Sequence, residues 1–89
     1  MLLKKGRAFC ILLLPKNQKD YGVLMEIKQL KKGTKEERIQ QELENALAQI
    51  SDNKYYKELE AHQIHNRIEI AIVFVGKEVF LMPKQNAQP

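Results

Sequence analysis

A carboxylate and an ammonium group lie two residues apart in the mostly apolar segment Tyr21-Gly-Val-Leu-Met-Glu-Ile-Lys-Gln29. Side chains alternate faces along a β-strand, so Glu26 and Lys28 are expected to leave the strand on the same face. A charged pair inside a small domain is costly unless it binds something. A carboxylate can hold a divalent cation while a lysine stabilises a phosphate oxygen or positions water, as metal-dependent phosphodiester hydrolysis requires. The alternative is an edge strand with two solvated charges.

Apolar patterning predicts the elements that must position this pair. Residues 8–14 form a continuous apolar run ended by a proline, and after a polar turn residues 21–29 form a second strand, which predicts an antiparallel hairpin. Thr34 followed by Glu37 predicts a capping box. A helix should follow, because apolar residues recur at helical spacing at Ile39, Leu43, Ala46, Leu47 and Ile50.

A shorter second helix is expected through Tyr55, Tyr56 and Leu59, with Asp52 or Asn53 as its cap. Residues 68–75 and 78–82 then read as two strands around a Gly-Lys turn. The order strand, strand, helix, helix, strand, strand predicts an α/β fold with a small mixed β-sheet and helices packed on it. The helical connection makes strands 21–29 and 68–75 parallel neighbours, while the hairpins are antiparallel.

Several short motifs follow one another in a fixed order along the chain. They are Gly6-Arg7-Ala8, Pro15-Lys16, Glu26-Ile27-Lys28, Ala46-Leu47-Ala48-Gln49-Ile50 and Tyr55. Over Gly6 to Met82 the chain thereby resembles the PD-(D/E)xK nuclease superfamily, in particular the C-terminal nuclease-like domain of bacterial AAA-ATPase-like proteins. The resemblance implies a truncated restriction-endonuclease-like core that acts on nucleic acid.

The resemblance also implies roles for single residues. Glu26 would be a catalytic residue and the metal ligand, Lys28 the catalytic cation, and Gln49 and Tyr55 supporting residues of the site. If the strand at Glu26 were absent, Gln49 would read as an exposed helix residue and Tyr55 as a core aromatic.

Phe9 departs from the family pattern, because it stands where the family has its metal-binding aspartate. A phenyl ring offers no lone pair to a hard cation. Mg²⁺ binding is therefore expected to be weak or absent, and hydrolysis weak or inactive, with Phe9→Asp strengthening metal binding beside Glu26. Glu42 or Glu44 could replace the aspartate. The alternative function is a non-catalytic nucleic-acid- or protein-binding module, or a homodimer in which a second copy covers an exposed sheet edge and apolar face.

Composition adds bounds to these hypotheses. The chain has 89 residues and a net charge of +4, which fits one domain over residues 1–82 with a disordered tail over 83–89. Arg7, Lys31 and Lys32 are candidate contacts to nucleic-acid phosphates, although a lysine-rich surface also serves solubility. Arg7 could instead pair with a helix carboxylate.

The single cysteine and the hydropathy pattern bear on compartment. Cys10 lies in an apolar run, where packing is the expected role, and a chain with one cysteine fits the reducing cytoplasm. No segment reaches about 20 consecutive apolar residues, so no membrane association is expected. His62 and His65 lack further ligands at zinc spacing and read as surface residues. There is no glycine-rich phosphate loop, so ATPase activity in this chain is unsupported.

Overall fold

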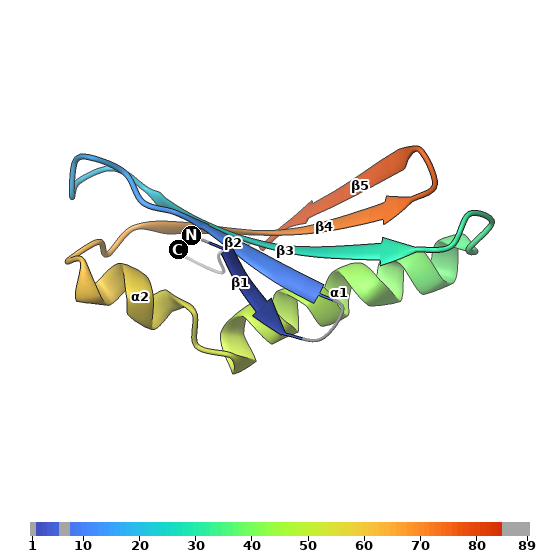
Figure 1. Ribbon diagram of the computed structural model, residues 1–89, viewed down its shortest axis with the longest axis horizontal. Helices are drawn as coiled ribbons and strands as arrows, with labels where there is room; N and C mark the ends of the chain where they lie inside the picture. The colour runs from blue at the N-terminus through green and yellow to red at the C-terminus, as the bar shows by residue number, and fades with distance from the viewer. Residues whose placement is uncertain (1, 6–7, 85–89) are drawn as a thin grey trace, which may run out of the picture.

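A mixed β-sheet forms one layer of the protein, and helices cover one of its faces (Figure 1). The computed structural model describes residues 2–5 and 8–84, with side chains from Phe9 onward. Within these residues, five strands form a sheet in the order β1-β2-β3-β4-β5, together with two helices. The elements are β1 Leu2–Lys5, β2 Ala8–Leu13, β3 Gly22–Leu30, α1 Glu36–Asp52, α2 Tyr56–Ala61, β4 Arg67–Val75 and β5 Glu78–Pro83.

The strand pairing confirms the predicted mixed sheet. β3 and β4 are parallel neighbours with Glu26 opposite Ala71, and both helices lie in the connection between them. The β2–β3 and β4–β5 pairs are antiparallel. β1 was not predicted: it is a short segment of two leucines and two lysines that pairs antiparallel with β2. Hydrogen bonding to β2, rather than a sequence period of its own, makes it a strand.

The predicted helix caps were wrong in detail. The Thr34 hydroxyl donates to the carbonyl oxygen of Lys31 within the preceding turn, and Lys35 is the N-cap of α1. At the other end α1 continues through Asp52, and Lys54 adopts a left-handed conformation with φ of 56° before α2 begins. Tyr55, not Asp52 or Asn53, is therefore the N-cap of α2.

The helices pack on the sheet through two apolar clusters. One cluster lies under α2 and the end of α1, and the other lies between α1 and β4. A β-carbon at position 22 would overlap the side chain of Leu59, so glycine there lets α2 sit directly on the start of β3. The first cluster contains Cys10, Leu12, Leu24, Ile50, Leu59 and Ile64, and the second Ile39, Leu43, Ala46, Ala71, Val73 and Val75.

The last described residues continue the sheet. β5 includes Pro83, where the expected tail began, and the backbone N–H of Lys84 donates to the carbonyl of Glu69 at 2.8 Å. Residues 85–89 lie outside the described part of the chain. Neither described helix is long and apolar enough to cross a lipid bilayer.

Candidate functional site

Glu26 lies at the middle of β3 and faces the helices. β3 has β2 on one side and β4 on the other, so the alternative of an edge strand with solvated charges is wrong. The Glu26 residue is only 2% exposed. Among the described residues, its Oε1 atom has no hydrogen-bond partner. A buried carboxylate oxygen without a partner is costly, which marks this position as unusual for a purely structural residue.

Lys28 projects from the same face of β3, as predicted, but it is held by α1. Its Nζ lies 3.4 Å from Oε2 of Glu42. The Nη2 atom of Arg38 lies 3.3 Å from the other carboxylate oxygen of Glu42. Glu42 is one of the two acids that could replace the missing aspartate, and its side chain does turn inward. Both of its oxygens already face cations, and Glu44 is exposed.

Burial favours the neutral forms of the groups around Glu26. Burial raises the pKa of the Glu26 carboxyl, and the Lys28 ammonium opposes this in part. Burial, with a further contribution from the negative charge of Glu26, raises the pKa of the Cys10 thiol to about 12. The pKa of Tyr55 is raised by burial, then by Glu26 and Cys10, against a hydrogen bond with Asn53. These three groups form a desolvated cluster under the sheet.

Gln49 lies on α1, and Tyr55 is the N-cap of α2. Tyr55 is close enough to Glu26 for its pKa to respond to that charge. Gln49 follows Glu42 by seven residues, so the two share one side of α1. Its side chain is half-buried. The supporting roles assigned to both residues stay predictions.

Phe9 does not lie beside Glu26. In the β2–β3 register Phe9 is opposite Ile27, and Cys10 is opposite Glu26. Cross-strand partners project on the same face, so Phe9 faces away from the helices and Cys10 is the neighbour of Glu26. The expectation that an aspartate at position 9 would reach Glu26 is therefore wrong. Spacing along one strand could not reveal this, since it leaves the register with the next strand open.

The side chains next to Glu26 do not form a good Mg²⁺ site. Mg²⁺ prefers an octahedron of oxygen ligands and is usually held by one or two carboxylates together with water and substrate oxygens. Glu26 offers one carboxylate, and its neighbour Cys10 is a protonated soft ligand. Within residues 9–84, no group of three or more His, Cys, Asp or Glu side chains is arranged to hold a metal ion. The donor set around Glu26 therefore does not fit Mg²⁺.

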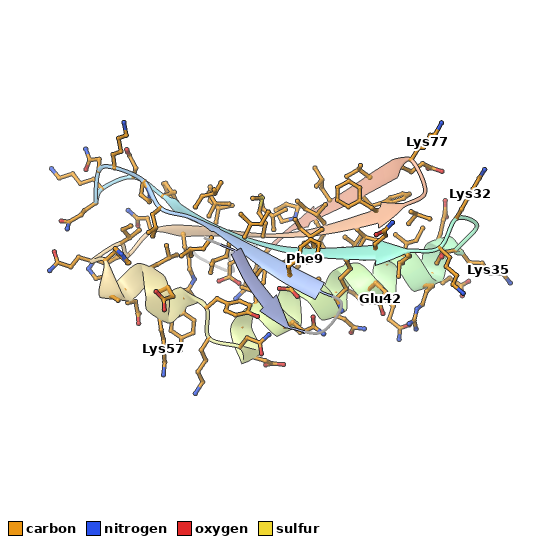
Figure 2. All side chains as sticks on the ribbon, viewed as in Figure 1. Phe9, Lys32, Lys35, Glu42, Lys57 and Lys77 are labelled. Atoms are coloured by element: carbon orange, nitrogen blue, oxygen red, sulfur yellow. The ribbon has the colours of Figure 1, made fainter. Side chains whose placement is uncertain are left out.

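Lysines gather where β3 and β4 end, and we call this region the basic end. It comprises Lys31, Lys32 and Lys35 from the β3–α1 loop and Lys77 from the β4–β5 turn, all of them exposed. The two loops are adjacent, because a β-carbon at Gly76 would lie 3.5 Å from Cβ of Lys32. Figure 2 shows Lys32, Lys35 and Lys77 extending from this end of the molecule. Arg7, the third candidate for phosphate contact, lies outside the described residues.

A third buried acid, after Glu26 and Glu42, was not singled out from the sequence. Glu69 in β4 is 5% exposed, and its Oε2 accepts a hydrogen bond from Arg67 Nε at 2.7 Å. Its Oε1 lies 3.7 Å from Lys84 Nζ, an ion pair too long for a hydrogen bond. Arg67 also stacks over the ring of Tyr56. Glu69 shares with Glu26 a buried Oε1 that has no hydrogen-bond partner among the described residues, but unlike Glu26 it is held in ion pairs with Arg67 and Lys84. His62 and His65 are exposed, as expected.

A central strand that carries Glu-x-Lys towards a helical layer, in a mixed sheet, defines a nuclease-like α/β domain. Residues 2–84 match the PD-(D/E)XK nuclease superfamily. The chain belongs to that superfamily, whose members typically use divalent metals. No curated protein and no solved structure matches the chain significantly. The relation to AAA-ATPase-like proteins stays a prediction.

Proposed function

We propose that this PD-(D/E)xK domain hydrolyses phosphodiesters weakly or not at all and acts as a nucleic-acid-binding module. The proposal of weak or absent hydrolysis rests on the burial and the contacts of the Glu-x-Lys pair. Glu26 is buried beside a thiol, and Lys28 is ion-paired with Glu42. Neither group is presented to a substrate in the way that phosphodiester hydrolysis requires.

The pairing of Lys28 is the sharper part of this argument. A lysine that stabilises a phosphate oxygen must direct its ammonium at the substrate. Here the ammonium is directed at the Glu42 carboxylate, and both side chains are largely buried, at 14% and 11% exposed. Releasing Lys28 would leave Glu42 with Arg38 alone in a partly desolvated position, which opposes a catalytic role for the lysine.

Nucleic-acid binding is supported by the basic end. β3 and β4 are parallel, so their carboxyl ends meet at one edge of the sheet, the edge at which open α/β sheets commonly bind ligands. Lys31 and Lys32 follow β3 directly, and Lys77 lies in the turn after β4. A cluster of exposed lysines attracts phosphates independently of base sequence. The formal net charge of +4 acts in the same direction.

The proposal that hydrolysis is weak or absent is tested by comparing wild type with Glu26→Ala. Calorimetric titration with Mg²⁺ and Mn²⁺ is combined with cleavage assays on linear and branched DNA. We expect no metal binding at the site and no cleavage above that of Glu26→Ala. Metal-dependent cleavage by wild type that disappears in Glu26→Ala would overturn this proposal and show that the domain is an active nuclease.

Nucleic-acid binding is tested by fluorescence anisotropy with single- and double-stranded DNA and RNA over a range of salt concentrations. Lys31→Ala/Lys32→Ala is expected to weaken binding and to lower the salt slope by about 2, at about 0.9 per lost phosphate contact. The matched control is Lys16→Ala/Lys19→Ala, which removes the same charge from the β2–β3 loop at the opposite end of the sheet (Figure 1). Equal losses in both double variants would show that only net charge matters.

A further inference from the structure

The face of the sheet opposite the helices is apolar and uncovered. Figure 1 shows both helices on one side of the sheet and no described element on the other. Leu81 and Val79 in β5 are 63% and 52% exposed. We call this surface the open face. Following the register from β2 to β5, it is formed by Phe9, Ile11, Leu13, Val23, Met25, Ile27, Gln29, Ile68, Ile70, Ile72, Phe74, Val79, Leu81 and Pro83, of which Gln29 is the one polar residue.

This pattern differs from that of a sheet built to face water. A sheet with one solvated face alternates apolar and polar residues, whereas strands buried on both faces read as continuous apolar runs. From Ile70 to Val75 the sequence of β4 is Ile-Ala-Ile-Val-Phe-Val. Along β2 to β5, the residues whose side chains project from the open face include no charged one. The open face therefore has the composition of a buried layer.

We propose that the open face is covered by the open face of a second copy of this chain, forming a two-fold symmetric dimer with two sheets packed face to face. The proposal is independent of nucleic-acid binding. A two-fold interface needs a self-complementary surface, and the uncharged, mostly apolar face of β2 to β5 meets that condition because these four strands bring no like charges together there.

The size of the open face also fits a dimer. β3 and β4 each contain nine residues. β2 and β5 each contain six residues, so at about 3.3 Å per residue and about 4.8 Å between strands the four strands cover about 480 Å². The two copies together would then bury a contact of about 1,000 Å², which is the size that a specific protein interface should reach.

The experiment measures molar mass and stability of the full chain. Size-exclusion chromatography with light scattering compares wild type with Leu81→Lys and with Phe74→Lys/Leu81→Lys. These side chains are already exposed, so a monomer can hold the added charge in water, while a dimer would bury it. The matched control is Ala48→Lys, which adds the same charge to an exposed position on α1.

We expect wild type and Ala48→Lys at twice the 10.4 kDa chain mass, and the open-face variants at one chain mass with an unchanged far-ultraviolet circular dichroism spectrum. The Tm of wild type should rise with protein concentration, a test that needs no variant. A wild-type monomer with a concentration-independent Tm would overturn the proposal and assign the face to a different occupant. A dimer that persists in both open-face variants, or larger assemblies in wild type, would overturn it too.

Discussion

Replacing Glu26 with methionine is expected to stabilise the fold. Methionine has nearly the shape of glutamate but no polar oxygen, and it would lie beside Cys10 in an apolar setting. The exchange removes a carboxylate whose Oε1 has no partner among the described residues. An unsatisfied buried polar group costs about 1–3 kcal/mol. For a domain of this size, that gain corresponds to a rise of about 4–24 °C in Tm.

The sign of the pH dependence follows from the raised pKa. Burial lifts the pKa of Glu26 in the folded protein above its ordinary value of 4.5. At a pH between the ordinary pKa and the raised pKa, the folded protein holds a proton that the unfolded chain has released. The free energy of unfolding of wild type therefore falls as pH rises through this range. The protonated carboxyl is accommodated best below pH 4.5. The advantage of Glu26→Met should therefore be smallest there and grow towards neutral pH.

The assay is urea unfolding followed by circular dichroism from pH 4 to pH 8, at one protein concentration throughout because any self-association shifts apparent stability. Glu44→Met is the matched control, since Glu44 is an exposed acid on α1 and the same exchange there removes no buried charge. A Glu26→Met protein less stable than wild type at pH 7 would refute the reasoning, because it would mean that the carboxylate makes a stabilising contact.

Three further predictions concern the neighbours of Glu26. The Cys10 thiol, with a pKa of about 12, should resist iodoacetamide at pH 8 in the folded protein and react fully in denaturant; rapid native labelling would contradict its burial. Cys10→Asp should raise Mn²⁺ affinity in calorimetry by setting two carboxylates side by side, whereas Phe9→Asp should match wild type because it faces away. In a double-mutant cycle, Lys28→Ala and Glu42→Ala should show a coupling of about 0.5–3 kcal/mol in urea unfolding, and additive effects would show that the ion pair contributes nothing.

The sequence was enough to predict the order of the main elements and the shared face of Glu26 and Lys28. Both depend on repeats within one segment, namely the alternation of side chains along a strand and the helical spacing of apolar residues. Alternation along a strand is a property of the backbone, so two residues at spacing two share a face wherever the strand lies. The helical repeat from Ile39 to Ile50 likewise predicted α1 and its buried side. The long helical connection was enough to predict that β3 and β4 are parallel.

The state of the site was decided by contacts between residues far apart in the chain. Cys10 rather than Phe9 faces Glu26 because the β2–β3 register sets the pairing, and a shift of one residue exchanges the faces. Lys28 is held by Glu42 because α1 docks across β3. Periodicity within a segment places a side chain on a face, whereas its partner and its burial depend on which other segment packs there.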